Sequence, residues 1–283
     1  MALADFQYSY NGLTFGDGTS YEVVNATGLD SLPDVYSADQ PRSRDHGDWR
    51  GDDFAGGRTL TFLVEVIGAT DTLYRANVDA LRAATVPQTS EMPLIFQLAG
   101  MSGNRRIYCR PRRRMPPTDL ASRFRMAAAP LEFRATDPRI YDDTLQSFTI
   151  ALAVATGGFS FPFTFPFTFG TGGTSGVQVV TNTGNFATRP VITITGPVDN
   201  PTIESVTAGK HLTFAITLAN TDTLTIDTDA RSVLLNGTAS RRNTMTSDST
   251  WFELPPGAST LSYHANTVQV GSTAIIAFRS AWL

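Results

Sequence analysis

The residues able to do chemistry are few in this chain and lie far apart along it. Histidines occur only at His46, His211 and His264, and the single cysteine is Cys109. Nucleophilic and acid–base catalysis needs such a group beside an activating partner. No histidine adjoins Cys109 or a glycine-flanked serine, and there is no phosphate-binding loop, dinucleotide fingerprint or HExxH motif. The sequence therefore predicts no enzyme, no cofactor and no catalytic metal.

Charge pairing is the second kind of chemistry that the residue types allow. Residues 1–53 carry ten Asp or Glu and three Arg, whereas residues 105–139 carry ten Arg and three Asp or Glu. Such segments either neutralise each other within one subunit or attract a copy of the chain head-to-tail. We expect the subunit-interface candidates to be Asp45, Asp48, Asp52 and Asp53 on one side and Arg105, Arg106, Arg110, Arg112, Arg113 and Arg114 on the other.

Two other interpretations of these charged segments are weaker. The aspartates lie in a polar segment rich in Gly and Pro, residues 28–57, but their spacing is not that of an EF-hand. The arginine run, with Tyr108 among its members, is of a type that tracks nucleic-acid backbones, yet residues 1–156 are net negative as a whole. We therefore expect a solvated acidic loop and no direct nucleic-acid site.

The elements that must position these residues follow from hydrophobic periodicity. Residues 58–68 alternate as a strand should, with Leu60, Phe62, Val64 and Val66 on one face. Residues 71–85 have helical spacing, with the stripe Leu73, Ala76, Ala80, Leu81 and Ala84 and a cap at Thr70 or Asp71. Residues 93–100 and 105–110 predict a hairpin, which we expect to be a long arm.

The second half, residues 177–283, shows strand after strand at regular spacing without helical periodicity. This pattern predicts a β-sandwich or barrel, with Asn236-Gly237 at one tight turn. Aromatic residues there offer an alternative function, because a host-surface carbohydrate-binding module stacks sugars on exposed rings. Its candidates are Trp251, Tyr263 and Trp282, and their exposure decides between binding and packing. A hydrolase of cell-wall polymers would need a carboxylate pair in a cleft, and no pair singles itself out.

Between the halves lies an aromatic ribbon, GGFSFPFTFPFTFGTGG, at residues 157–173. Every second residue is Phe, so the rings share one face of an extended strand. Pro162 and Pro166 lack an N–H and leave a single pairing edge. We expect residues 157–176 to be an ordered interdomain strap between domains 1–156 and 177–283, with Phe161, Phe163, Phe165 and Phe167 buried.

The chain lacks signals for export or membrane insertion. Its first residues, MALADFQYSYNGL, contain neither a basic nor an apolar signal-peptide region, and no apolar run approaches the ~18 residues of a membrane span. One cysteine allows no intramolecular disulfide. We expect synthesis in a cytoplasm.

The order of these segments resembles the distal tail proteins of phages with long non-contractile tails. The resemblance rests on GRTLTFLVEVIG, DTLYRANVDALRAA, the hairpin PLIFQLAGMSGNRRIYCRPRRR and LEFRATDPRIYDD in the first half. In the second half it rests on GNFATRPVITITGPVDNPTI, TLTIDTDARSVLLNG, WFELPPGASTLSY and the terminal FRSAWL. The stretch FPFTFPFTFG is similar to the domain-joining segment of actinobacteriophage members.

The resemblance implies a mainly β fold and a structural role. The first domain would be an α+β ring-forming sandwich or barrel with one helix and a long β-hairpin arm, and the second a galectin-like β-sandwich. Six copies would form a ring at the distal end of the tail tube in the virion. The partners implied are the chain itself, the tube protein, the tail-tip or baseplate hub protein and the tape measure protein. DNA would pass only transiently through the lumen.

Overall fold

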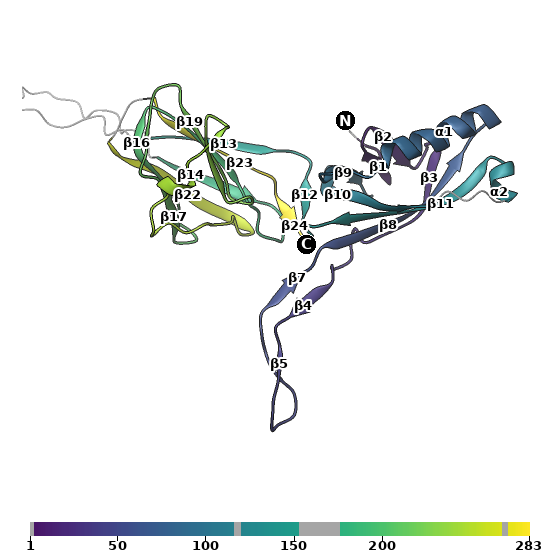
Figure 1. Ribbon diagram of the computed structural model, residues 1–283, viewed down its shortest axis with the longest axis horizontal. Coiled ribbons are helices and arrows are strands. Elements are labelled where there is room, and N and C mark those ends of the chain that lie inside the picture. The colour runs from purple at the N-terminus through teal and green to yellow at the C-terminus, as the bar shows by residue number, and fades with distance from the viewer. Residues whose placement is uncertain (1–2, 116–119, 153–175, 268–270) are drawn as a thin grey trace, which may run out of the picture. The chain divides into compact units, whose positions relative to one another are not determined.

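The computed structural model describes residues 3–115, 120–152, 176–267 and 271–283 (Figure 1). The chain is mainly β and divides into two compact units, Met1–Asp143 with Leu283, and Thr144–Trp282. The expected strap and its residues Phe161, Phe163, Phe165 and Phe167 lie outside the described residues, apart from Gly176.

The first unit is a curved antiparallel sheet with one long helix. The strands follow the order β2-β1-β9-β10-β11-β8-β3, and β12 pairs with β10. Their bounds are β1 Gln7–Tyr10, β2 Leu13–Gly16, β3 Tyr21–Thr27, β8 Arg58–Ile67, β9 Met92–Gln97, β10 Arg105–Arg114, β11 Met126–Ala135 and β12 Ile140–Asp142. Asn11 and Gly12 form the β1–β2 turn with φ of 46° and 80°, conformations that Asn and Gly tolerate best.

Strand β8 organises the core of this unit. Its side chains alternate as the sequence predicts, and Leu60, Phe62, Val64 and Val66 are all buried. The Phe62 ring meets the Tyr8 ring edge-on at 5.1 Å and the Phe133 ring at 5.9 Å. Aromatic pairs of this kind each add about 0.5–1.5 kcal/mol to area burial.

The predicted helix is confirmed as α1, Asp71–Ala84, and the Thr70 hydroxyl caps it by accepting from the Leu73 N–H. Its buried face differs from the predicted stripe. The buried residues are Tyr74, Val78, Leu81 and Ala84, whereas Leu73 is 46% exposed. The stripe counted small alanines as core and passed over Tyr74, whose ring buries more apolar area than any alanine. A second helix, α2, is the single turn Leu120–Arg123.

A long hairpin projects from the β3–β8 edge, and we call residues 34–55 the arm (Figure 1). It is paired twice, first β4 Val35–Ser37 with β7 Asp53–Ala55, then β5 Gln40–Pro41 with β6 Asp48–Trp49. The sequence predicted a loop for these residues and instead expected the hairpin of residues 93–100 and 105–110 to be a long arm. That hairpin does form, but the expectation that it projects as an arm was wrong, because β10 is an inner strand between β9 and β11.

The second unit is a sandwich of two antiparallel sheets. One has the order β13-β23-β15-β19-β20-β21, and the other β14-β22-β16-β17 with β18 beside β16. Their bounds are β13 Gln146–Ala151, β14 Val177–Asn182, β15 Val191–Thr195, β16 Val198–Ser205, β17 Lys210–Thr213, β18 Thr217–Leu218, β19 Thr223–Asp227, β20 Ser232–Leu235, β21 Ala239–Ser240, β22 Gly257–Thr267 and β23 Thr273–Phe278, with η1 Arg242–Thr244 and β24 Ala281–Trp282.

The core of the sandwich is aliphatic and aromatic. Ile192, Ile226 and Ile276 face it from one sheet and Leu261 and Ile203 from the other. Strand β13 belongs to this sandwich, because it pairs along its whole length with β23. The chain therefore passes from the first compact unit to the second between Asp143 and Thr144, which is earlier in the sequence than the boundary expected at residue 156.

Candidate assembly surfaces

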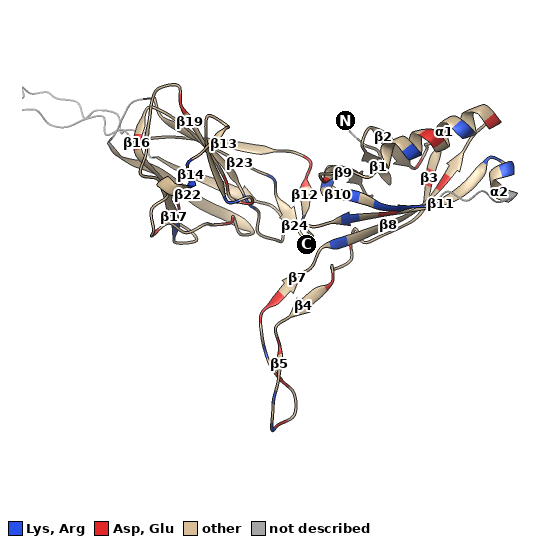
Figure 2. Cartoon of the chain, in the orientation of Figure 1, with Lys and Arg blue, Asp and Glu red and all other residues tan. Residues whose placement is uncertain are grey.

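The arm carries the predicted acidic residues and exposes them all. Asp45, Asp48, Asp52 and Asp53 are exposed, as is nearly every other residue from 34 to 54. Counted over residues 34–55, the arm has six Asp and three Arg and is net −3 (Figure 2). A segment that buries almost nothing within its own subunit gains little stability from that subunit.

Exposed aromatic side chains lie among the arm's charges. Tyr36 and Phe54 stack across the β4–β7 pair with ring centroids 5.7 Å apart, and they are 61% and 51% exposed. Trp49 is 65% exposed and lies 4.7 Å beneath the Arg42 guanidinium. Aromatic residues and arginine are enriched in the buried centres of protein interfaces. The arm thus exposes aromatic and arginine side chains of types that are enriched in interfaces, beside six aspartates, a type that is depleted there.

Hydrogen bonds within the arm hold its two halves in register. The Asp39 carboxylate accepts from the Gly51 N–H at 2.7 Å, a bond that lowers the pKa of Asp39. The Ala38 N–H donates to the Asp52 carbonyl at 3.1 Å. The arm is therefore a formed hairpin with its own pairing.

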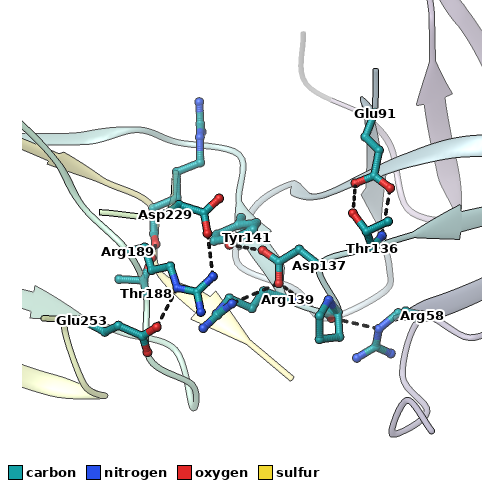
Figure 3. A network of polar contacts seen from close by, with 12 residues as sticks. Arg58, Glu91, Thr136, Asp137, Arg139, Tyr141, Thr188, Arg189, Asp229 and Glu253 are labelled. Carbon is teal, nitrogen blue, oxygen red and sulfur yellow. Dashed lines mark hydrogen bonds and ion pairs between the residues drawn. The ribbon is translucent and has the colours of Figure 1, made fainter. Parts of the chain in front are cut away.

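The base of the arm is clamped by Arg58, a buried cation that the sequence did not single out. The Arg58 Nη1 donates to the carbonyls of Gly28 and Leu29 at 2.8 and 3.1 Å, and to that of Ser31. Its Nε donates to the Pro138 carbonyl at 3.1 Å (Figure 3). Burial lowers the pKa of Arg58. The guanidinium joins the chain entering the arm to the turn after β11.

That turn is itself tightly bonded. The Asp137 carboxylate accepts from the Tyr141 hydroxyl at 2.5 Å and from the Arg139 guanidinium at 3.2 Å. The Glu91 carboxylate accepts from the Thr136 N–H and hydroxyl, both at 2.9 Å (Figure 3). These bonds fix the backbone carbonyl that Arg58 uses.

The predicted arginines do not form one surface. Arg106 pairs with Asp143, its Nε donating at 2.8 Å. Arg114 donates at 2.8 Å to the Arg82 carbonyl and at 2.9 Å to the Thr85 hydroxyl, which satisfies the C-terminal end of α1. Arg105 and Arg110 are half-buried, whereas Arg112 and Arg113 are exposed. Of this last pair, Arg113 donates from its Nε to the Met115 Sδ at 2.9 Å.

Further exposed cations and apolar groups lie near α2. Arg123 and Arg125 are exposed and flank Phe124, which is 70% exposed, and Met126 beyond is 45% exposed. We call Arg112, Arg113 and residues 123–126 the basic surface. Within the described ranges, no ion pair joins the arm to these arginines; the arm's ion pair is internal, Arg42 with Asp45 at 3.4 Å. Among the described residues, the arm and the basic surface thus form no ion pair with each other.

The alternative sugar-binding candidates fare differently from one another. Tyr263 is 1% exposed in the sandwich core, and its hydroxyl bonds the Ser272 hydroxyl at 2.5 Å, so it cannot be a stacking platform. Trp251 and Trp282 are half-buried. The sequence named Tyr263 as a candidate because alternation along a strand does not say which of its two faces is covered.

The titratable groups do not assemble a catalytic site in the described residues. Cys109 is fully buried, and burial raises the pKa of its thiol. His211 bonds Asp248 at 3.2 Å on the surface, and His46 and His264 are exposed. Across the described ranges there is no group of three potential metal ligands and no helix long and apolar enough to cross a bilayer.

Comparison with known proteins agrees with the fold. Residues 183–282 match the family model described as the siphovirus-type tail component, C-terminal domain. The Dit protein of phage SPP1 has a TM-score of 0.68 at 15% identity, covering 98% of this chain and 99% of that one. A chain of the phage P2 baseplate in its activated conformation with Ca has a TM-score of 0.53 at 10% identity, covering 96% and 97%.

No curated protein sequence matches significantly. At these identities the structural likeness is one of fold, and it extends over both units. It confirms the mainly β architecture and the resemblance to distal tail proteins. The chain has the fold of the SPP1 Dit protein, and its residues 183–282 match the model of the siphovirus-type tail component, C-terminal domain.

Proposed function

We propose that this protein is a structural subunit of a phage tail tip that assembles as a closed homohexameric ring. The observation that carries the proposal is the arm, an exposed acidic hairpin with Tyr36, Trp49 and Phe54 uncovered. The arm finds no partner among the described residues of its own chain, and a basic surface lies elsewhere on the same unit. Both features suit a heterologous interface, and heterologous contacts that close make rings.

In the proposed ring the arm of each subunit lies against the basic surface of the next. Opposite charges steer the contact and fix its register, while the aromatic side chains supply most of the buried area. The ring joins the tail tube to the tip or baseplate hub, with the tape measure protein as a further neighbour. It leaves a lumen for DNA, and acidic side chains toward that lumen would repel phosphates. No catalytic step is assigned to the subunit.

Charge reversal tests the interface. One variant carries Asp52→Arg and Asp53→Arg on the arm, and another carries Arg112→Glu and Arg113→Glu on the basic surface. Each variant alone opposes like charges at every interface and is expected to remain monomeric in native mass spectrometry. Mixed together, the two present opposite charges at both alternating contacts, so assembly is expected to return as hexamers containing three copies of each.

The matched control is Arg241→Glu with Arg242→Glu, the same change in charge on the C-terminal sandwich, which is expected to assemble normally. Assembly of both single-surface variants, or failure of the mixture to recover, would exclude the arm-to-arginine contact. A wild-type protein that stays monomeric within assembled tails would exclude the ring itself.

A further inference from the structure

The loops at one end of the C-terminal sandwich line a surface cavity of about 380 Å³ that is open to solvent. They are the segment before β15, the turns β16–β17 and β19–β20, and the chain leading into β22. Its lining residues are Ala187, Arg189, Ala208, Lys210, Thr228, Arg231, Trp251, Phe252, Glu253 and Pro255. Its volume lies in the range of sites for small ligands. The cavity belongs wholly to one unit and lies apart from the arm and the basic surface in sequence.

One wall of the cavity is aromatic. Trp251 packs partly against the sandwich core and is half-buried, so the rest of its surface lines the cavity. Phe252, the next residue, is 1% exposed and anchors the segment in the core. A tryptophan supported in this way presents apolar surface without much side-chain entropy to lose on binding.

A preformed ion-pair network makes the second wall. The Arg189 Nε donates to Glu253 at 2.6 Å, and its Nη1 donates to Asp229 at 2.6 Å. Burial opposes the charge of Arg189, but hydrogen bonds to Glu253 and Asp229 raise its pKa above the ordinary value. Arg189 is thus a positioning residue that fixes the Glu253 carboxylate at the rim.

Two further cations reach the cavity without such partners. Lys210, the only lysine of the chain, and Arg231 are both exposed, and neither side chain has a hydrogen bond or ion pair with the residues that the structure describes. Residues 144–283 contain six Lys or Arg, and three of them line this one cavity. The lining is net +2, from three cations and Glu253.

We propose that this cavity binds a sugar ring that carries a carboxylate or phosphate group. Trp251 would stack on the apolar C–H face of the ring, Lys210 and Arg231 would pair with the anion, and Glu253 would accept from ring hydroxyls. An inorganic anion alone leaves Trp251 unused, and a neutral sugar leaves both cations unused. Of these three ligand classes, an anionic saccharide is the one that contacts both Trp251 and the two cations. Charge-assisted hydrogen bonds to the anion would make the site selective for it.

The test titrates the full chain by calorimetry with four probes: glucuronic acid, glucose 6-phosphate, glucose and inorganic phosphate. We expect one or both anionic sugars to bind at least roughly tenfold more tightly than glucose or inorganic phosphate, the factor typical of one charge-assisted hydrogen bond. The ratio of the two anionic sugars then shows whether the natural ligand is a uronic acid or a sugar phosphate.

Variants assign the binding to this cavity. Lys210→Gln and Arg231→Gln remove exposed cations that have no partner among the described residues, and each is expected to weaken binding of the anionic sugar roughly tenfold at unchanged melting temperature. Arg242→Gln, an exposed arginine that does not line the cavity, is the matched control and should bind as wild type. Trp251→Phe keeps an apolar wall and should weaken binding less than Trp251→Ala.

The proposal would be overturned if neither anionic sugar bound at about 10 mM, a concentration at which weak binding of a sugar to a single site is still detectable. It would also be overturned if inorganic phosphate bound as tightly as the anionic sugars. Full binding by the double Lys210→Gln, Arg231→Gln variant would be the third contradicting result. Native mass spectrometry of the same variants reports assembly separately. The proposal of a sugar site and the proposal of a ring can therefore be refuted independently of each other.

Discussion

The sequence does not reveal the role of Arg58, whereas in the structure its guanidinium donates hydrogen bonds to four backbone carbonyls. It reads as the first position of an alternating strand, yet it points inward with Leu60 and Phe62 and is 2% exposed. Its partners are backbone carbonyls and not a carboxylate. Its Nε and Nη1 donors tie together the base of the arm, whereas its buried Nη2 has no hydrogen-bond partner among the described residues.

We expect Arg58→Met to lower the free energy of unfolding by about 3 kcal/mol, because it leaves several buried carbonyls without a donor. Arg58→Lys should recover only part of this loss, since one ammonium cannot span the same set of carbonyls. Chemical denaturation measures both. Arg134→Met, which removes a single bond to the Thr59 hydroxyl, is the control and should cost about 1 kcal/mol. Equal losses at the two positions would contradict the clamp.

Two buried acids near β10 make the first unit sensitive to alkali. Burial, with Cys109 and Glu91 nearby, raises the pKa of Tyr10 to about 12 from 10.0, and burial also raises the pKa of Cys109. The folded state holds these protons more tightly than the unfolded state. Stability is therefore complete below about pH 9 and falls as pH rises toward 12, by up to about 1.4 kcal/mol per unit for each group.

We expect the melting temperature to fall between pH 9 and 12, and that of Tyr10→Phe to fall less steeply than wild type between pH 10 and 12. Cys109→Ala should reduce the part of the fall that begins near pH 9. Circular dichroism melts across this range give the slopes. Tyr36→Phe, which alters an exposed ring on the arm, is the matched control and should leave the wild-type slope unchanged. Identical slopes for Tyr10→Phe and wild type would show that the tyrosine does not contribute.

At the scale of elements, the arm shows why a formed hairpin can look like a loop in sequence. Its paired segments are two or three residues long, and both of their faces are exposed. Strand prediction rests on alternation between a buried and an exposed face, and here nothing is buried. The same reasoning places the arm outside the cooperative fold of its unit.

We expect removal of residues 39–51, with Asn-Gly joining Ala38 to Asp52, to leave the melting temperature within about 2 °C of wild type. The deleted residues bury almost no apolar area, and surface changes of this kind alter stability little. The same deletion should abolish the ring in native mass spectrometry. A large loss of thermal stability would mean that the arm is part of the core, and an intact ring would mean that the arm is not the interface.

For the molecule as a whole, the position of β13 decides where one folding unit ends. Ile150 and Leu152 are buried in the core of the C-terminal sandwich, and β13 forms the edge of its six-stranded sheet. The sequence assigned this strand to the first domain, because a strand's partner cannot be read from its own alternation. Because β13 directly follows the strands of the first domain, we expected it to pair with them, whereas its partner β23 lies much later in the sequence.

We expect a fragment of residues 144–283 to fold and a fragment of residues 177–283 to be several kcal/mol less stable. The shorter fragment lacks two core side chains, each of which contributes about 2–5 kcal/mol in truncation experiments. Urea denaturation of both fragments measures the difference. The longer fragment with Ile150→Ala and Leu152→Ala is the matched control and should approach the shorter one. Equal stability of 144–283 and 177–283 would return the boundary to residue 156.

The sequence by itself determined many of the local elements. Periodicity identified β8, α1 and strands of the second half, and Asn236-Gly237 identified one tight turn. It also separated the acidic from the basic residues, since charge is a property of the residue alone.

Only the tertiary structure decided which of these residues are exposed and which meet. It buried Arg58 and Tyr263, tied Arg106 and Arg114 within the unit, and left the arm's aspartates uncovered. It also gathered Arg189, Lys210, Arg231 and Trp251 around one cavity from four separate loops. The reason is physical: burial and proximity depend on pairings between distant strands, and a strand's own sequence does not name its neighbour.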